Sequence, residues 1–196
     1  MIATLLLGAA AQAAPTSYTL DAGKSRLFVI VRNDTSTVAS GLGHDHAIVA
    51  QRFDGKVTWD PDDLSVCNVS ISLPVDGLFP DPPGYREIAG LDPDGAVDDG
   101  AKKQIKKNFL KGSQLDGSRF PSISYQSSRC APSSVAGRVD VTGTLSIRGV
   151  GLEVTVPMKV SAGPSSFAAD GRFEASHGDF GFKPFTNLLG ALRNLD

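Results

Sequence analysis

Alternation of apolar and polar residues recurs along this chain and constrains its fold more than any other feature of the sequence. In residues 67–75, CNVSISLPV, every odd-numbered position is apolar and most of the positions between them are polar. A segment with this period of two forms a β-strand that buries one face and exposes the other. The pattern returns in residues 138–149 and 153–161, so the sequence predicts one-faced strands in both halves of the chain.

Several segments share the length and composition of such strands. They are residues 17–21, 25–31, 52–60, 67–75, 122–128, 138–149, 153–161 and 166–176. We therefore expect an all-β fold in which about eight antiparallel strands close into a β-barrel. A two-sheet β-sandwich is the alternative, because its strands also have one apolar face. The 21 Gly and 12 Pro residues fit the many turns that either fold requires.

One long connection interrupts the strands. Residues 76–100 are rich in Pro, Gly and Asp and have no period, which predicts an excursion over the surface. Residues 101–111, AKKQIKKNFLK, then place Ala101, Ile105 and Phe109 four positions apart, as in a short amphipathic helix. The lysines between them are typical of a solvated helix face, with contact to anionic lipid head groups as the alternative.

The N-terminus has the pattern of a secretory signal. Residues 2–11 form a short apolar run, and Ala11-Gln12-Ala13 fits a cleavage site, although no positive residue follows Met1. We expect residues 1–13 to be a removed signal peptide and residues 14–196 to form one periplasmic or secreted domain. No later segment has the roughly 20 apolar residues of a membrane helix, so no stable membrane insertion is predicted. A net charge of −2 argues against a general attraction to nucleic acid.

Two cysteines are candidates for one disulfide. Cys67 begins a predicted strand, and Cys130 ends the predicted strand that starts near Ser122. If these strands are antiparallel neighbours, both cysteines reach the same end of the sheet, as a disulfide requires. An oxidising compartment would favour the bond. The alternative is a pair of buried thiols.

The three histidines raise the question of a metal site. His44 and His46 flank Asp45, and residues two apart on an extended segment point the same way. Together with His177 they could supply the ligands of a metal-binding protein or metalloenzyme. The alternative is that they form hydrogen bonds or contact a ligand head group at the barrel rim. No nucleophile elbow is present, so we predict no catalytic residue.

The order of several motifs resembles the YceI-like family of periplasmic proteins. The motifs are YTLDAGKSRLFVIVRN, GHDHAIVAQRFDGKVTWDPDDLS, FLKGSQLDGSRFPSISYQSS, VTGTLSIRGVGLEVTVPMKV and GDFGFKPFTNLLGALRNLD. The resemblance implies a lipocalin-like barrel whose apolar interior carries a polyisoprenoid or another long-chain amphiphilic lipid. The two cysteines and the Gly/Pro/Asp-rich insertion between Leu73 and Gly100 depart from the plainest family pattern, so the size of the ligand is open.

With this resemblance, we expect a non-catalytic periplasmic carrier whose only small-molecule partner is the lipid, with no cofactor. The inward faces of the strands supply the predicted lining: Phe53, Val57, Val69, Ile71, Leu73, Tyr125, Val141, Leu145, Val156, Met158, Phe167 and Phe173. A structural or interaction domain with a filled core is the alternative, because the same residues suit either interior. An exposed sheet edge or the Leu-rich tail would also allow a homodimer, which nothing in the sequence requires.

Overall fold

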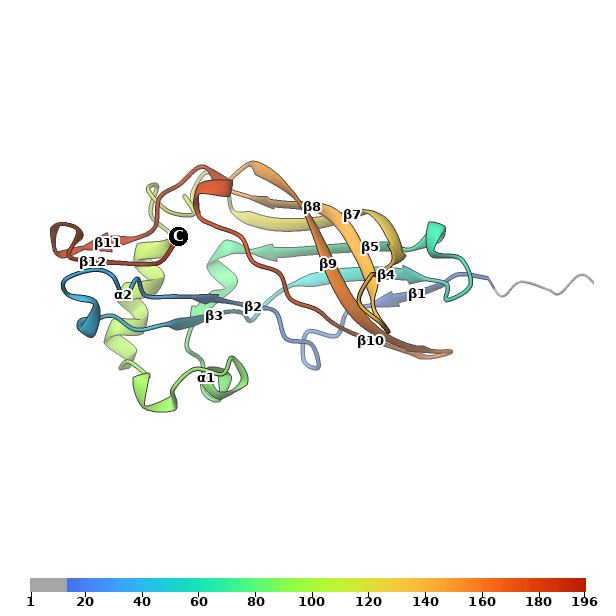
Figure 1. The fold of residues 1–196 in the computed structure, drawn as a ribbon, viewed down its shortest axis with the longest axis horizontal. Helices are drawn as coiled ribbons and strands as arrows, with labels where there is room; N and C mark the ends of the chain where they lie inside the picture. Colours follow the sequence, from blue (N-terminus) through green and yellow to red (C-terminus); the bar gives the residue numbers. More distant parts are fainter. Residues whose placement is uncertain (1–13) are drawn as a thin grey trace, which may run out of the picture.

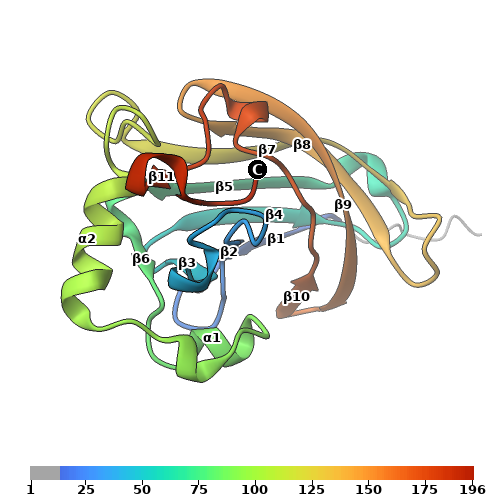
Figure 2. The ribbon, with the colours of Figure 1, turned by 60° about the vertical axis from the view of Figure 1, so that its left-hand side comes forward.

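The computed structural model describes residues 14–196, apart from the side chain of Leu188, so the predicted signal peptide lies outside the described residues. Its main element is a seven-stranded antiparallel sheet that curls into a nearly closed barrel (Figures 1 and 2). In sheet order, the strands are β1 (Thr16–Thr19), β4 (Asp54–Trp59), β5 (Asn68–Pro74), β7 (Ser122–Pro132), β8 (Val139–Ile147), β9 (Val150–Gly163) and β10 (Ser166–Asp170). The prediction of an all-β, lipocalin-like barrel is therefore confirmed.

A second, three-stranded sheet extends the barrel at one end. It contains β2 (Phe28–Val31), β3 (His46–Ala50) and β6 (Leu78–Pro80), with β3 in the centre. The chain passes from β3 into β4 through a bend, and from β5 into β6 through the single turn Val75–Gly77. Gln51 N–H donates to the Gly77 carbonyl at 3.0 Å, so this hydrogen bond joins the two bends.

The sequence did not predict β3 or β6. None of the predicted strands covers residues 46–50, and β6 lies within the predicted surface excursion. Residues 47–50 are all buried. A strand that is covered on both faces has no polar face, so it lacks the alternation by which the other strands are recognised.

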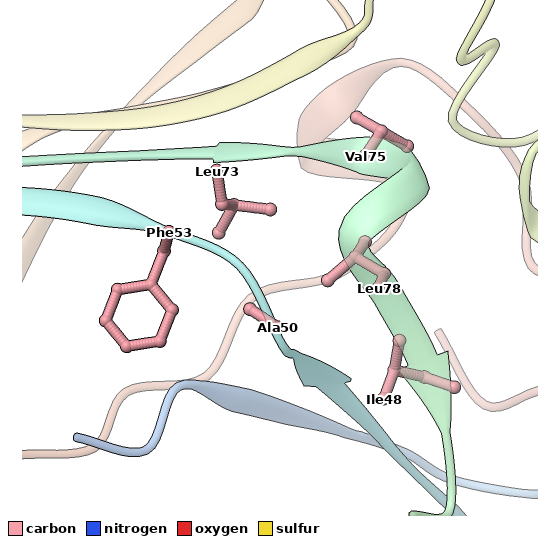
Figure 3. Close-up of a cluster of buried hydrophobic side chains, with 6 residues drawn as sticks. All are labelled: Ile48, Ala50, Phe53, Leu73, Val75 and Leu78. Atoms are coloured by element: carbon pink, nitrogen blue, oxygen red, sulfur yellow. The ribbon is translucent and has the colours of Figure 1, made fainter. Parts of the chain in front are cut away.

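An apolar cluster fills the bend between the two sheets. Figure 3 shows its buried side chains, which come from β3 with the bend that follows it, from β5 with its following turn, and from β6: Ile48, Ala50, Phe53, Leu73, Val75 and Leu78. The helix α2 (Asp99–Phe109) packs Ile105 and Phe109 against this cluster. The Asp98 carboxylate caps α2 by accepting the Ala101 N–H at 2.8 Å, so the predicted helix is confirmed. A shorter helix, α1 (Tyr85–Ile88), lies within the predicted excursion.

Hydrogen bonds at two places join segments across the open side of the barrel. At one end, the Tyr18 hydroxyl of β1 donates to the Gly163 carbonyl of β9 at 2.9 Å. At the other end, the C-terminal hairpin of β11 (Thr186–Asn187) and β12 (Leu192–Arg193) reaches β2, where Leu195 N–H donates to the Arg32 carbonyl at 2.8 Å. Within residues 14–196, neither helix has the length and apolar character needed to cross a bilayer.

Candidate functional site

A row of apolar side chains crosses the inner face of the barrel. Ile71, Tyr125 and Leu145 lie directly opposite one another on β5, β7 and β8, and Leu152 of β9 continues the row. Directly opposed residues share one face of a sheet. All four side chains are only partly buried. This part of the inner face is therefore apolar without being fully packed.

The predicted lining residues differ in how far they are covered. The buried ones are Phe53, Val57, Leu73, Val141 and Val156, and the partly exposed ones are Val69, Ile71, Tyr125, Leu145, Met158 and Phe167. Phe173 had been placed on the last strand. β10 ends at Asp170, and Phe173 lies in the following coil with 42% of its surface exposed. Its predicted place on a strand is wrong, because the chain leaves the sheet after residue 170.

Aromatic rings fill one end of the interior. The ring of Phe167 lies 5.3 Å from that of Tyr18 and 5.9 Å from that of Trp59, measured between centroids. Nearby, Tyr125 covers Gly143, where an added Cβ would lie 2.7 Å from the phenol ring. Burial raises the pKa of the Tyr125 hydroxyl, which donates to the Val141 carbonyl at 3.2 Å. Aromatic rings thus occupy the interior near β10, whereas Leu145 is partly exposed.

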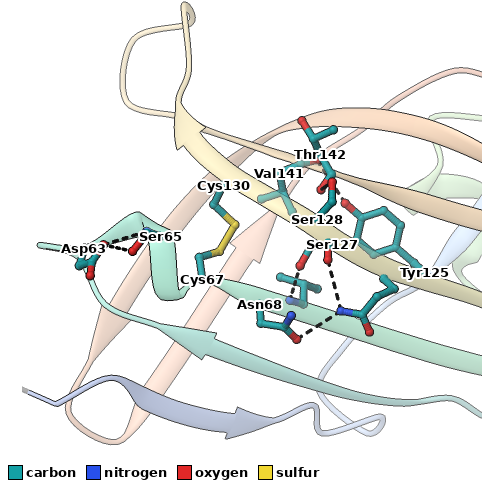
Figure 4. The surroundings of a disulfide bond; sticks show 12 residues. Asp63, Ser65, Cys67, Asn68, Tyr125, Ser127, Ser128, Cys130, Val141 and Thr142 are labelled. Carbon is teal, nitrogen blue, oxygen red and sulfur yellow. Dashed lines mark hydrogen bonds between the residues drawn. A yellow bond between two sulfur atoms is a disulfide. The ribbon is translucent and has the colours of Figure 1, made fainter.

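The disulfide lies at this filled end. Cys67 and Cys130 are bonded, with their Cα atoms 5.9 Å apart, and both are buried beside Val57 and Val141. Figure 4 shows the bond linking the segment before β5 to β7. Because β5 and β7 are antiparallel neighbours, the start of one strand lies beside the end of the other. The predicted disulfide is confirmed, and the two strands are antiparallel neighbours, as the prediction assumed.

A buried polar network occupies the opposite end of the molecule. His46 Nδ1 lies 2.6 Å from Asp81 Oδ2, and the other carboxylate oxygen of Asp81 accepts the Ala47 N–H at 2.9 Å. Arg86 Nη1 approaches the same oxygen at 3.4 Å and donates to the Asp45 carbonyl at 2.7 Å. The side chains of Asp81 and Arg86 are both buried. The Asp81 carboxylate therefore links the start of β3 to Arg86 in the segment Tyr85–Ile88.

The charge state of Asp81 follows from these partners. Burial by itself would raise the pKa of the carboxyl. The hydrogen bonds from His46 and Ala47 and the positive charges of His46 and Arg86 outweigh that effect and lower the pKa below 3.8. Asp81 is therefore an anion at neutral pH and a fixed counter-charge for Arg86.

A cleft of about 290 Å³ opens beside this network. Its lining comprises Arg32, Gly43, His44, Asp45, Arg86, Gly90, Leu91, Asp92 and Gly95. Arg32 Nη1 lies 3.1 Å from Asp45 Oδ2, and the ring of His44 is 6.3 Å from that of His46. The cleft therefore presents imidazole and guanidinium groups together. A second hollow of about 490 Å³ lies beside the end of α2, between Pro74, Leu110 and Pro121.

The three histidines do not form one site. His177 lies against the C-terminus, with Nδ1 3.5 Å from Asp196 Oδ1 and its ring 5.3 Å from that of Phe182. Burial lowers the pKa of His177, although the charge and hydrogen bond of Asp196 act in the opposite direction. Among residues 14–196, no three His, Cys, Asp or Glu side chains are grouped so that they could hold a metal ion. The metal site built on His44, His46 and His177 was therefore a wrong alternative.

The sequence does not indicate Asp81 and Arg86 as site residues, because they lie in the Pro-rich insertion, whose composition predicts an exposed segment. A local signal was available in the turn itself. Asp81 has a φ of 43°, a left-handed conformation that Asp adopts more readily than most residues, and it is followed directly by two prolines. The partner, His46, is 35 residues away, and no local pattern connects the two.

The C-terminal hairpin is fixed by an ion pair with Asp34. Arg193 Nε donates to Asp34 Oδ2 at 3.0 Å, and Arg193 Nη2 contacts the same oxygen. Hydrogen bonds from the Ser36 hydroxyl, from Arg193 and from the Ser36 N–H lower the pKa of Asp34 to about 2. Asp34 thus couples the end of β2 to β12.

We expect the Asp34 carboxyl to titrate near pH 2, and an Arg193→Gln variant to move this midpoint toward 3.8. Because the folded pKa lies below the unfolded value, the contribution of Asp34 to stability is complete above pH 3.8 and is lost as the pH falls toward about 2. Carbon-13 NMR titration of the carboxyl measures the shift. Arg172→Gln, which alters an exposed arginine paired with Glu174, is the control. An unchanged Asp34 midpoint in Arg193→Gln would contradict the assignment.

Comparisons with known proteins give a consistent result. The sequence profile of the YceI-like domain matches residues 18–193. The fold is similar to that of BcnA from Burkholderia cenocepacia, with a TM-score of 0.59 and 21% identity over 82% of each chain. It is also similar to the YceI protein of Campylobacter jejuni, with a TM-score of 0.53 and 13% identity over 91% of this chain and 92% of that one. No curated protein sequence matches the chain.

Proposed function

Because the chain belongs to the YceI-like family, we propose that it is a periplasmic carrier that holds a long-chain isoprenoid-type or other amphiphilic lipid in the barrel interior, without catalysis. The disulfide supports an oxidising compartment, and the signal pattern of residues 1–13 supports export. The apolar inner face supports a lipid as the ligand.

One observation carries the proposal: the row of Ile71, Tyr125 and Leu145 faces inward and yet stays partly exposed. In a filled core, these side chains would be covered by their neighbours. Transfer of an alkyl or isoprenoid chain onto this face would remove apolar surface from water, at roughly 0.8 kcal/mol for each buried CH₂. A long chain can then bind tightly with few polar contacts.

We place the polar end of the ligand in the cleft lined by His44, Arg32 and Arg86. His46 lies beside it and is oriented by Asp81. Imidazole and guanidinium groups can donate hydrogen bonds to the oxygens of a head group. His177 is in a different place, beside Asp196, and has no part in this arrangement.

Organic extraction of the protein from its native periplasm, followed by mass spectrometry, tests the proposal. We expect a long-chain lipid in stoichiometric amount. The aromatic cluster of Tyr18, Trp59 and Phe167 favours the alternative of a structural domain with a filled core. That alternative is correct if the native protein carries no lipid and the purified protein binds no isoprenoid.

A bulky residue in the inner row should block the lipid. We expect Leu145→Trp to reduce the amount of lipid bound per protein by about tenfold, because the indole would occupy the space beside Ile71 and Tyr125. Thr144→Trp is the matched control, since Thr144 is the preceding residue on β8 and is exposed on the outer face. Binding is measured by native mass spectrometry with added isoprenoid. Equal binding by the two variants would place the lipid elsewhere.

A further inference from the structure

Three large apolar side chains project into solvent from two neighbouring loops. Val38 is 98% exposed and Leu42 is 70% exposed, both in the loop between β2 and β3. Leu189, in the turn between β11 and β12, is fully exposed. Single exposed apolar residues are ordinary on protein surfaces. These three are exposed on two loops that are hydrogen-bonded to each other, and they do not cover the core.

Hydrogen bonds hold the two loops side by side. Ala39 N–H donates to the Ala191 carbonyl at 2.8 Å, and Asp34 N–H donates to the Arg193 carbonyl at 2.9 Å. The ion pair of Arg193 with Asp34 links the same segments. Leu189 and the following Gly190 both have positive φ, as residues of a tight turn often do. The tips are thus presented together on a fixed base. We name Val38, Leu42 and Leu189 the apolar tip.

The apolar tip lies at the end of the molecule that also carries α2. Figures 1 and 2 show the β11–β12 hairpin, the loop before β3 and α2 together at the end opposite β10. The helical segment 98–111 includes five lysines and two aspartates, and the aspartates, Asp98 and Asp99, stand at its N-terminal start. Lys106 is engaged, because its ammonium donates to the Asp76 carbonyl at 2.6 Å and lies 3.3 Å from the centre of the Phe79 ring. Lys103 and Lys107 are exposed and face solvent.

We propose that this end of the molecule docks on the surface of an anionic lipid bilayer. The apolar tip enters the head-group region, where its side chains leave water, and Lys103 and Lys107 face the negative lipids. Exposed apolar side chains at the same end as the exposed Lys103 and Lys107 complement an anionic bilayer better than they complement a second copy of this chain, whose same face would bring these lysines together. The inference goes beyond the carrier role, because it concerns the outer surface and holds whatever the barrel contains.

Vesicle co-flotation with delipidated protein tests the docking surface. We expect binding to vesicles of phosphatidylglycerol and phosphatidylcholine, weaker binding to phosphatidylcholine alone, and loss of binding at high salt. The triple variant Val38→Asn, Leu42→Asn and Leu189→Asn should lower the affinity about tenfold or more. Lys103→Glu with Lys107→Glu should lower the affinity for the anionic vesicles only.

Matched controls are available at the other end of the barrel. Val135 is 48% exposed in the turn between β7 and β8, so Val135→Asn removes an exposed apolar side chain outside the apolar tip. Lys56→Glu with Lys159→Glu makes the same change of charge on β4 and β9. The proposal is overturned if the wild type does not bind the anionic vesicles, or if the tip and control variants bind equally. It is also overturned if sedimentation velocity shows that the apolar tip instead forms a dimer. Lipid extraction is measured separately, so failure of docking is distinct from failure of the carrier role.

Discussion

Replacing Cys67 and Cys130 by alanine is expected to lower the free energy of unfolding by about 4 kcal/mol. The bond joins residues 63 positions apart, so its removal frees a long loop in the unfolded chain. In the chain-entropy model, a loop of this length corresponds to roughly 4 kcal/mol. Alanine is preferred to serine because both positions are buried among apolar side chains.

Urea unfolding at neutral pH, followed by circular dichroism, measures this effect. The wild-type protein treated with a reductant is the matched control, since it breaks the same bond without changing the sequence. Its stability should fall by a similar amount. A loss below about 1 kcal/mol in both samples would mean that the loop is held in the unfolded state by other contacts.

Asp81→Asn is expected to lower the free energy of unfolding by about 3 kcal/mol. The substitution removes the charge that faces the buried guanidinium of Arg86 and weakens the bond to His46. Asn tolerates the positive φ of this position, so the backbone is not the cause of the loss. Chemical denaturation measures the change. Asp76→Asn is the control: it removes a carboxylate from an exposed pair with Arg52 and should cost between about 0 and 1 kcal/mol.

A double variant separates the charge effect from a general loss of packing. When Arg86→Met is added to Asp81→Asn, the guanidinium without a counter-charge is removed, so the two losses should sum to more than the loss of the double variant. Strict additivity would show that Asp81 and Arg86 do not interact. Lowering the pH should also lower the free energy of unfolding of the wild-type protein. Because the folded pKa of Asp81 is lowered, its contribution to stability is present above pH 3.8 and is lost as the pH falls through the folded pKa.

The lining of the barrel could be predicted to a large extent, because the alternation of apolar and polar residues along a strand indicates which side chains share a face. Ile71, Tyr125 and Leu145 were assigned to the inner face from their own segments, and the register places them opposite one another. Phe173 was misplaced for the same reason, since the alternation continues in the sequence beyond the point where β10 ends. A periodic pattern indicates a face and does not indicate where hydrogen bonding to the next strand stops.

The polar end of the candidate site could not be predicted. The spacing of His44 and His46 is compatible with a metal pair, whereas in the structure His46 pairs with Asp81 of the insertion. Asp81 lies in a stretch that is rich in Pro and Asp, a composition typical of exposed turns. It is buried here because the Ala47 amide and the Arg86 guanidinium contact one of its oxygens and the His46 ring contacts the other.

The sequence by itself determined the class of fold, the inner faces of the one-faced strands, the amphipathic α2 and the end of the sheet at which the cysteines meet. Each of these depends on local periodicity and on antiparallel neighbours. Only the tertiary structure decided that residues 46–50 and 78–80 pair in a second sheet and that Asp81 joins His46 to Arg86. Those features depend on contacts between segments far apart in the chain, where burial on both faces removes the alternation and long-range partners determine the state of each charge.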